Sequence, residues 1–356
     1  MHKMTDEHRD GGQAADGTLL DQHAVAGQLA LPPLTGPELL AERATMELAI
    51  GAIESSLRDG WLQAEPPRQL LRPPIGQLLL MPSWNDTGLG VKLTTVRARQ
   101  NGAVLPRIQG LFVLFQLPDM TPTLAVDAAS LTALRTPAVS AVATKYLALP
   151  SAHRLVVFGT GPEAEGHVLA VSCVRQLSFV GVVGHSPDKG EALAATLRRQ
   201  GFPAHAVGPE AVAEADIVCT CTSSRTPVYD GTLLPPSVHI NAVGTHEPDA
   251  RELDDVTFRD SVVVVEGREV ALREAGDIIM ARASGALSRD IALHELGAVV
   301  RGETTAAGGR RTVFKSVGTS GQDLVVGQML LQRLIALGHR QPSGDSAAWL
   351  LRTSHR

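Results

Sequence analysis

Aromatic residues are scarce in this chain of 356 residues, where Phe, Trp and Tyr together make up 3%. The core must therefore be built mainly from the aliphatic side chains Leu, Val, Ile and Ala. No apolar run reaches the roughly 18 residues of a membrane-spanning helix, so we expect no membrane partner. Residues 1–21 are polar and lack the apolar segment of a signal peptide, which predicts a cytoplasmic protein.

The chain also has few cysteines and only a small net charge. The three cysteines, Cys173, Cys219 and Cys221, are too few and odd in number for a disulfide framework. Cys219 and Cys221 alternate along an expected strand without other ligands nearby, so we expect no metal site. The net charge of -5 gives no electrostatic case for a nucleic-acid partner.

The first half of the chain predicts a small α+β domain. Residues 1–35 show no steady hydrophobic period and are expected to form a disordered extension. Residues 36–59 carry apolar side chains at helical spacing, and Gly60 ends that helix. Short apolar stretches joined by Gly and Pro turns then predict an antiparallel or mixed sheet. Its expected strands are Gln77–Met81, Gly90–Val96, Gly110–Gln116 and Leu124–Val126, followed by a helix over Ser130–Leu147.

The pattern changes at Pro150, where buried strands begin to alternate with helices. The expected strands are Leu155–Phe158, Ser178–Val183, Asp216–Thr222, Val238–Val243 and Ser261–Glu266, and one more strand, Thr312–Ser316, is expected separately after about residue 304. Such alternation is typical of a doubly wound parallel sheet. The fold class expected is therefore α/β, with a central Rossmann-type domain over residues 151–304. A second α+β domain is expected from residues 36–150 plus 305–340, including a helix over 322–337, with a tail at 341–356.

A glycine-rich turn follows the first strand of the predicted Rossmann domain. It reads Gly159-Thr160-Gly161-Pro162-Glu163-Ala164 and opens a helix, the context that a dinucleotide-binding fingerprint requires. The first glycine allows the tight turn, the second admits a pyrophosphate, and Ala164 permits close packing. The helix N-terminus offers N–H groups to the phosphates. The alternative is a tight turn in an empty sheet.

The end of the next strand bears on the choice between NADPH and NADH. An acidic residue there would bind the ribose hydroxyls of NADH. The chain has none directly at the strand end, whereas His185, Ser186 and Lys189 could surround a 2′-phosphate. We therefore expect NADPH, with NADH possible. In the alternative interpretation, Asp188 caps a helix and His185 is merely solvated.

Several further segments carry a family resemblance together with the glycine turn. They are Glu65-Pro66-Pro67-Arg68, Gly90-Val91-Lys92, Leu131-Thr132-Ala133-Leu134-Arg135-Thr136, Ala215-Asp216-Ile217-Val218, Asn241-Ala242-Val243-Gly244, Arg251-Glu252-Leu253-Asp254 and Phe314-Lys315-Ser316-Val317-Gly318. In this order and spacing, over about residues 37–338, the chain resembles the ornithine cyclodeaminase/mu-crystallin family. The resemblance implies a homodimer, a nicotinamide cofactor, and a small substrate with a carboxylate beside an amine or imine. It also implies that the α+β domain binds substrate and forms the dimer.

The resemblance assigns roles to three basic residues. Arg68 and Arg135 resemble the arginines that bind the substrate carboxylate, a task that suits the two parallel donors of a guanidinium. Lys92 matches the active-site lysine, which can bind the carboxylate or supply a proton to the substrate nitrogen. Without the motifs, each of the three would be interpreted as a solvated surface charge.

One departure from the family pattern bears on the reaction. Cyclodeaminases carry an aspartate base soon after a Val-Gly pair, whereas this chain has His246 at that position and Glu247 one residue later. The departure argues against ornithine cyclisation but does not hinder reduction of an imine, which needs only a hydride and a proton. His246 is either a catalytic proton donor or a loop histidine with a satisfied hydrogen bond.

The remaining expected cofactor contacts lie at strand ends and near the C-terminus. Thr222, Ser223 and Val243 follow Rossmann strands, whose carboxyl ends line the cofactor crevice. Asp323 matches the acidic residue of the family's Ser-Val-Gly-x-x-x-x-Asp motif, near the nicotinamide. The segment Thr226-Pro227-Val228-Tyr229-Asp230 is similar to pyrroline-2-carboxylate reductases.

The leading hypothesis is an NAD(P)H-dependent reductase of a cyclic imino acid, Δ1-pyrroline-2-carboxylate or Δ1-piperideine-2-carboxylate. An alanine or opine-type amino-acid dehydrogenase is the first alternative. A cyclodeaminase would release ammonia with no net change in cofactor. A non-catalytic ligand-binding protein of the mu-crystallin kind would bind cofactor without turnover.

Overall fold

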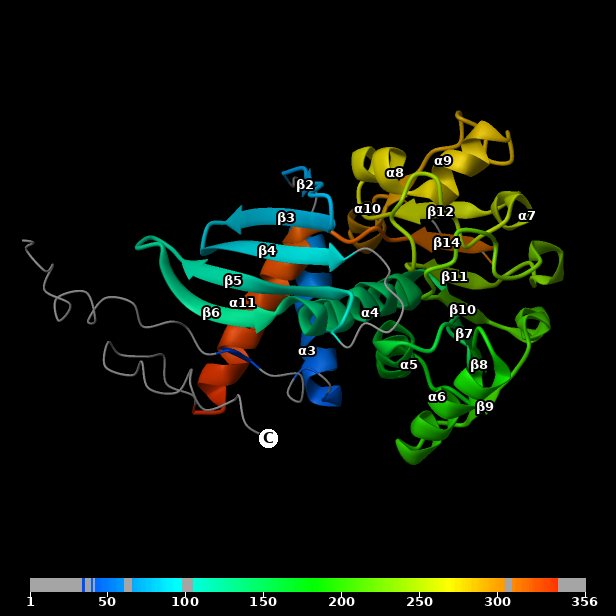
Figure 1. Cartoon of the computed structure of the whole chain (residues 1–356). Helices are drawn as coiled ribbons and strands as arrows, with labels where there is room; N and C mark the ends of the chain where they lie inside the picture. Colours follow the sequence, from blue (N-terminus) through cyan, green and yellow to red (C-terminus); the bar gives the residue numbers. More distant parts are fainter. Residues whose placement is uncertain are drawn as a thin grey trace, which may run out of the picture. The chain divides into compact units, whose positions relative to one another are not determined.

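The computed structural model describes residues 34–35, 40, 42–60, 66–97, 105–304 and 309–338, all within one compact unit spanning Pro32–Gln341. This unit contains an antiparallel sheet and a parallel sheet, each with its own helices (Figure 1). The expected tail at 341–356 and nearly all of the expected extension at 1–35 lie outside the described residues. The last two residues of that extension, Leu34–Thr35, form strand β1, so the expectation of disorder is wrong for them.

The first sheet has six strands in the order β1-β6-β5-β4-β3-β2, antiparallel except for the β1–β6 pair. Its strands after β1 are β2 (Gln69–Leu71), β3 (Gly76–Asn85), β4 (Gly88–Arg97), β5 (Ile108–Gln116) and β6 (Thr121–Asp127). Side chains alternate between the two faces of each strand, as the pleat requires. Met81, Lys92 and Phe112 lie in register across neighbouring strands and are all buried, so Lys92 belongs to the covered face.

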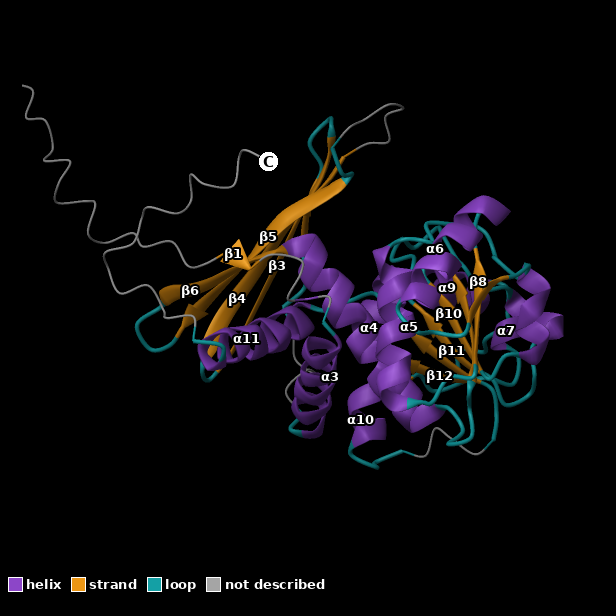
Figure 2. Cartoon of the chain, turned by 90° about the horizontal axis from the view of Figure 1, so that it is seen from below, coloured by secondary structure: helices purple, strands orange, loops and turns teal. Residues whose placement is uncertain are grey.

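Helices α4 (Ala128–Leu147) and α11 (Ser320–Ala336) cover that face, and α3 (Arg43–Arg58) packs against both of them (Figure 2). Helix α3 ends where expected, because Gly60 takes a φ of +78° directly after its C-cap. Asp127 caps α4 by accepting a hydrogen bond from the Ser130 N–H at 2.7 Å. Helix α4 also packs against α5 and β11 of the second sheet, and so joins the two layers.

The second sheet has eight parallel strands in the order β13-β12-β14-β11-β10-β7-β8-β9. They are β7 (Arg154–Phe158), β8 (Phe179–Val183), β9 (Ala204–Ala206), β10 (Ile217–Thr220), β11 (His239–Ala242), β12 (Val262–Val265), β13 (His294–Glu295) and β14 (Thr312–Lys315). The chain turns outward in opposite directions from β7 and β10. Ligands of doubly wound sheets bind at this switch point, beyond the carboxyl ends of the strands.

Strand β14 corrects the expected division of the chain. Residues 305–340 were assigned to the α+β domain, yet β14 pairs with β11 on one side and β12 on the other, inside the parallel sheet. Only the helix that follows, α11, packs on the antiparallel sheet. The segment between β14 and α11 therefore crosses from one layer to the other.

The remaining helices surround the parallel sheet. Helix α5 lies on the same side of it as α4, and α7 lies on the other side (Figure 2). Their bounds are α5 (Pro162–Val174), α6 (Pro187–Arg199), α7 (Asp255–Phe258), α8 (Arg268–Glu274), α9 (Gly276–Ala283) and α10 (Leu296–Val300), with short 3-10 helices at Pro209–Glu214 and Gly231–Leu233. Within the described residues, no helix is long and apolar enough to cross a membrane.

Two helical glycines offer a matched test of packing between α11 and the sheet. A Cβ on Gly327 would overlap the Phe112 ring, whereas a Cβ on Gly51 of α3 would meet nothing within 4 Å. Helix propensity alone favours alanine at both positions by up to about 1 kcal/mol. We expect Gly327→Ala instead to lower the free energy of unfolding by about 1–3 kcal/mol, because the added methyl overpacks the core.

Urea denaturation followed by circular dichroism measures both variants against the wild type. Gly51→Ala should leave the free energy of unfolding unchanged or raise it. An equal rise in the free energy of unfolding of both variants would show that α11 does not pack on Phe112 as closely as described.

Candidate active site

The glycine turn adopts the conformation that its residues predict. Gly159 has a φ of +117°, and a Cβ there would lie 2.6 Å from the Cys221 carbonyl oxygen. Gly161 is the N-cap of α5 and has open space before it, while Pro162 occupies the first helical turn. Ala164 is fully buried against the sheet. The backbone of this turn is therefore open to a phosphate group at the N-terminus of α5.

No carboxylate directly follows the end of β8. His185 and Lys189 are exposed, and Ser186 is the N-cap of α6. Asp188 lies in the first turn of α6, where its charge suits the positive end of the helix dipole. Asp188 therefore belongs to the helix, but the N-cap is Ser186 and not, as the alternative interpretation had it, Asp188.

A buried glutamate, Glu252, ties together the loops after β10 and β11. One carboxylate oxygen accepts hydrogen bonds from the N–H and the hydroxyl of Thr222, both at 2.7 Å. The other accepts from the Gly244 N–H at 2.8 Å and the Thr220 hydroxyl at 2.9 Å. Thr222, an expected cofactor contact, thus has its hydroxyl directed to Glu252.

Burial raises the pKa of Glu252, and its hydrogen bonds oppose that shift. A second buried pair adjoins it, in which Lys315 Nζ lies 2.9 Å from an Asp277 carboxylate oxygen and donates to the Thr245 carbonyl at 2.7 Å. These contacts hold the loop that contains Val243 and His246.

Strand β4, helix α4 and helix α11 meet at the buried carboxylate of Asp323. Asp323 lies in the first turn of α11 and is 0% exposed. Lys92 Nζ from β4 lies 2.8 Å from one of its oxygens, and Arg135 Nε from α4 lies 3.2 Å from the other. Desolvation lowers the pKa of Lys92 to about 8, although the charge of Asp323 acts to raise it.

Arg68 lies on the other side of the crossing segment from Arg135. Its Nη2 donates to the carbonyls of Val317 and Gly318, at 3.0 and 2.5 Å. Its Nε lies 2.9 Å from a carboxylate oxygen of Glu274 on α8. Gly318 separates the two arginines, since its φ is +73° and a Cβ there would lie 2.5 Å from Arg135 Nη1.

Glu266, directly after β12, holds the same crossing segment. Its carboxylate accepts from the N–H groups of Val317 and Gly318 at 2.9 Å, and from the Ser316 hydroxyl at 2.8 Å. It also accepts from Gln322 Nε2 at 2.7 Å. Glu266 therefore fixes the carbonyls that Arg68 binds and the start of the helix that carries Asp323.

His246 lies in the loop after β11 and is exposed. Partial desolvation lowers the pKa of His246 to about 4, and the positive charges of Arg68 and Lys315 act in the same direction. Desolvation and both charges thus all favour the neutral ring. This disfavours the imidazolium form that the sequence suggested as a proton donor.

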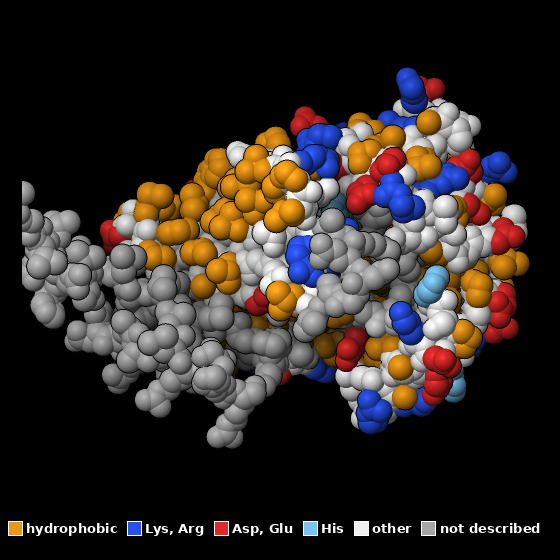
Figure 3. Space-filling view, viewed as in Figure 1, with side chains coloured by type: hydrophobic (Ala, Val, Ile, Leu, Met, Phe, Trp, Pro, Cys, Tyr) orange, Lys and Arg blue, Asp and Glu red, His pale blue; other side chains and the backbone are white. Residues whose placement is uncertain are grey.

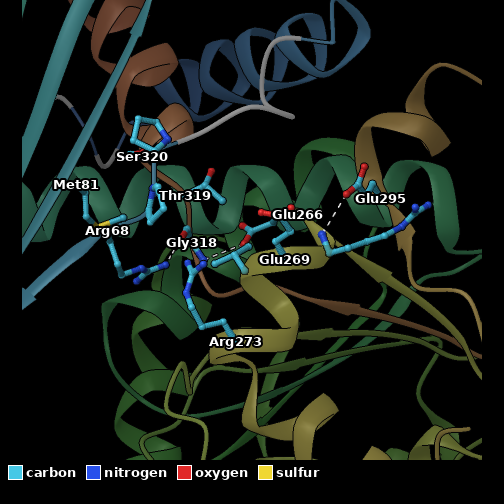
Figure 4. A pocket seen from close by; sticks show the side chains of 14 residues that line it. Arg68, Met81, Glu266, Glu269, Arg273, Glu295, Gly318, Thr319 and Ser320 are labelled. Atoms are coloured by element: carbon cyan, nitrogen blue, oxygen red, sulfur yellow. Dashed lines mark hydrogen bonds between the residues drawn. The ribbon is translucent and has the colours of Figure 1, made fainter. Parts of the chain in front are cut away.

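A cavity of about 200 Å³ opens beside Arg68. Arg68 and Met81 from the antiparallel layer, Gly318 from the crossing segment, and Glu269 and Arg273 from α8 line it (Figure 4). Figure 4 shows the Arg68 guanidinium beside the Gly318 backbone, with Glu266 behind. The cavity therefore lies next to Arg68, one of the three basic residues to which the resemblance assigns the substrate carboxylate.

These features fit a nicotinamide dinucleotide. The open Gly161 backbone at a helix N-terminus suits its pyrophosphate, and the Glu252-held loops border the crevice where its nicotinamide half would extend. Lys92 and Arg135 lie at the junction of the two layers, where both bind Asp323.

The sequence matches the model of the ornithine cyclodeaminase/mu-crystallin family over residues 38–336. The chain belongs to this family. A Δ1-pyrroline-2-carboxylate reductase of Bacillus cereus is 35% identical over 268 residues, covering 73% of this chain and 82% of the relative. The ketimine reductase mu-crystallin of Mus musculus is 36% identical over 259 residues, covering 72% and 80%.

Two solved structures share this architecture over most of the chain. The Δ1-pyrroline-2-carboxylate reductase of Thermococcus litoralis, in complex with NADH and L-proline, aligns with a TM-score of 0.79 at 28% identity, covering 86% of this chain and 98% of that one. An archaeal alanine dehydrogenase dimer with bound NAD also aligns with a TM-score of 0.79, at 25% identity, covering 86% and 97%. This family member is a nicotinamide-dependent oxidoreductase that acts on carbon–nitrogen bonds.

Sequence reasoning missed the acidic partners of this family site. Glu274 pairs with Arg68, while Glu252 and Glu266 fix the loops. One signal was available, because Glu266 is the last residue of an expected strand, and the carboxyl ends of such strands line the crevice. Glu274 carries no such signal, since its side of α8 is set only by tertiary packing.

Glu252→Gln tests the loop arrangement. A glutamine amide can accept at only one oxygen, so its NH2 group would face an N–H donor of Thr222 or Gly244. We expect the KM for the nicotinamide cofactor to rise about tenfold, which is about 1.4 kcal/mol of lost binding.

Steady-state kinetics at varied cofactor concentration measures the effect. The matched control is Glu214→Gln, since Glu214 is exposed and pairs only with Arg154 among the described residues. An unchanged cofactor KM in Glu252→Gln would contradict the role of Glu252 in holding these loops.

Proposed function

We propose that this protein is an NAD(P)H-dependent reductase of a cyclic imino acid. The substrate would be Δ1-pyrroline-2-carboxylate or Δ1-piperideine-2-carboxylate, reduced to proline or pipecolate. The observation that carries the proposal is the buried Lys92–Asp323–Arg135 cluster beside the dinucleotide crevice. The names of the B. cereus and T. litoralis relatives support the same substrate class.

The cluster has the charge that one carboxylate requires. Two cations share the single negative charge of Asp323, which leaves about one positive charge in a site shielded from water. We assign the substrate carboxylate to Arg135 and Lys92, with Arg68 joining across the Gly318 backbone. A carboxylate held by a guanidinium is fixed in distance and orientation, which presents the adjacent imine carbon in one pose.

Lys92 is the proton donor in this proposal. With a pKa of about 8 it is charged at neutral pH yet gives up its proton readily. The reduced nicotinamide supplies a hydride to the imine carbon, and Lys92 supplies the proton to the imine nitrogen. His246, neutral and exposed, would contribute at most a hydrogen bond at the site's edge.

Cyclodeamination is disfavoured by the loop after β11. The carboxylate nearest to the position of the cyclodeaminase aspartate is Glu247, and its side chain is exposed and pairs with Arg225. The one-residue shift thus directs this carboxylate to the surface rather than to Lys92. The base that removal of an amine needs is not supplied by this residue.

For the cofactor we propose a preference for NADPH. The support is the absence of a carboxylate directly after β8 and the presence there of His185, Ser186 and Lys189. Relatives of known structure contain NADH or NAD, so direct comparison of the two reduced cofactors decides the point.

We also propose a homodimer formed through the outer face of the antiparallel sheet. That face is apolar although no described element covers it: Leu93 pairs with Leu80 and Leu111, and Val91 with Val113. Leu93, Leu111 and Trp84 are exposed, and hydrophobic side chains gather over these strands (Figure 3). An antiparallel sheet open to water carries polar residues on its outer face, so this face fits a second copy of the chain. In this proposal residues 36–150 and α11 form the substrate-binding and dimerisation domain.

The reductase activity is tested by mixing the protein with NADPH and Δ1-pyrroline-2-carboxylate at neutral pH. We expect a steady fall in absorbance of the reduced nicotinamide, proline as product, and a lower kcat/KM with NADH. Parallel reactions contain the six-membered imine. No loss of absorbance with either imine and either cofactor would refute the proposed function.

The pH dependence of kcat/KM tests the role of Lys92. Because its protonated form is the active one, kcat/KM should fall as pH rises through about 8. Asp323→Asn removes the charge that raises the pKa of Lys92, so that fall should move to lower pH. The measurement is the pH profile of each protein over pH 6–9.5. If kcat/KM of Asp323→Asn fell at the same pH as in the wild type, the titrating group would be one other than Lys92.

Leu111→Glu tests the dimer surface. A carboxylate at the centre of the outer face would lie opposite its own copy or be buried, and we expect the variant to be monomeric at micromolar concentration. Light scattering after size-exclusion chromatography gives the mass. Leu233→Glu is the control, because Leu233 is similarly exposed, 41% against 45%, but belongs to the parallel-sheet layer. A dimeric Leu111→Glu protein would place the interface elsewhere.

A further inference from the structure

Helix α5 contains a buried histidine whose two ring nitrogens both have partners. His167 is 0% exposed. Its Nδ1 lies 2.6 Å from the backbone carbonyl oxygen of Glu163, one turn earlier on the same helix. Its Nε2 lies 3.0 Å from the hydroxyl of Ser140 on α4. The ring therefore joins the first turn of α5 to the neighbouring helix.

The partners of the His167 ring assign its hydrogen. Desolvation lowers the pKa of His167 to about 4, which favours the neutral ring with a single N–H. A carbonyl oxygen can only accept, so the hydrogen is on Nδ1 and is donated to Glu163. Nε2 then accepts from the Ser140 hydroxyl. The sulfur of Cys221, 3.5 Å from Nδ1, is a weak second acceptor.

The close approach of α4 and α5 makes the contact with Ser140 possible (Figure 2). Ala133, Pro137 and Ser140 follow one another at spacings of four and three residues, so they share one side of α4. A Cβ on Gly166 of α5 would lie 2.8 Å from the Pro137 ring and 3.0 Å from the Ala133 carbonyl oxygen. The missing side chain at Gly166 thus brings His167, the next residue, within reach of α4.

The first turn of α5 has one N–H left for a phosphate. The first N–H groups of a helix have no partner within it. Pro162 has no N–H, and the N–H groups of Ala164 and Glu165 donate to the Gly161 carbonyl at 3.0 and 3.2 Å. Among the described residues of this turn, the N–H of Glu163 is therefore the one available to a pyrophosphate at the helix N-terminus.

His167 holds the same residue from its other side. In a regular helix the Glu163 carbonyl accepts the backbone N–H of His167. The ring Nδ1 adds a second hydrogen bond to that carbonyl. With its carbonyl held by two donors, the backbone of Glu163 has less freedom to turn its N–H away from the phosphate.

We propose that His167 is a positioning residue for the pyrophosphate of the nicotinamide cofactor, which it serves by holding the backbone of Glu163. Ser140 keeps the ring in place. The proposal rests on the nicotinamide cofactor of the family and not on the substrate of the proposed function. The alternative is a structural tie between α4 and α5 that has no effect on the cofactor.

Asparagine and glutamine separate the roles of the two ring nitrogens. The amide nitrogen of asparagine is bonded to Cγ, as Nδ1 is, so His167→Asn keeps the donor to Glu163 and loses the contact with Ser140. The amide of glutamine lies one bond further out, as Nε2 does, so His167→Gln keeps the contact with Ser140 and loses the donor. Ser140→Ala removes the same contact as His167→Asn.

Fluorescence titration of the full-length protein with NADPH, and with NADH in parallel, gives the Kd of each cofactor without turnover. We expect His167→Gln to raise the Kd about tenfold, because the N–H of Glu163 is no longer held toward the phosphate. His167→Asn and Ser140→Ala should stay within about twofold of the wild type. Urea denaturation should show that both His167 variants are less stable than the wild type, since each leaves a buried group unpaired.

His239→Gln is the matched control. His239 is also 0% exposed, and its ring nitrogens contact Thr312 and Asn241 within the parallel sheet. This variant should lower the stability and leave both Kd values unchanged. It separates the loss of a buried histidine from the loss of the contact with Glu163.

Equal cofactor Kd values in His167→Asn and His167→Gln would overturn the proposal and favour the structural tie. If His167→Gln does not fold, His167→Asn decides: a Kd within about twofold of the wild type supports the proposal, and a tenfold rise overturns it. The imine assay is read separately. Cofactor binding that depends on His167 without imine reduction would refute the proposed function alone, and imine reduction with equal Kd in all variants would refute this proposal alone.

Discussion

The buried carboxylate of Asp323 is the contact on which the arrangement of the site depends. It binds a lysine from the antiparallel sheet and an arginine from the helix between the layers, and it is itself carried by the last helix. A buried ion pair of this kind adds little net stability, but removing one partner leaves uncompensated charge in the interior. Three segments distant in the sequence are thereby held in one relative position.

Two further carboxylates, those of Glu252 and Glu266, hold the loops of the site in place by accepting hydrogen bonds from them. Glu252 accepts hydrogen bonds from the segments after β10 and β11, and Glu266 accepts from the segment between β14 and α11. Loops at the carboxyl ends of strands lack the backbone hydrogen bonds that fix neighbouring strands to one another. A carboxylate can accept four hydrogen bonds, so it can take the place of those bonds and keep the loops rigid while leaving the site open.

These contacts explain why the site uses more acidic residues than its reaction requires. Each of Arg68, Lys92 and Arg135 is desolvated, and each has a carboxylate within 3.2 Å. The pairing reduces the attraction for an incoming anion to about one charge.

Local sequence signals determined much of this protein. The glycine turn, the strand and helix alternation, the separate antiparallel sheet and the family motifs all depend on neighbours within a few residues, and they singled out Arg68, Lys92 and Arg135, which the structure brings together around Asp323 and Gly318. Only the tertiary structure decided the partners of these residues, the place of β14 inside the parallel sheet, and the lowered pKa of His246. Each of those depends on groups brought together from distant parts of the chain, because burial and charge at a point are properties of everything that packs around it.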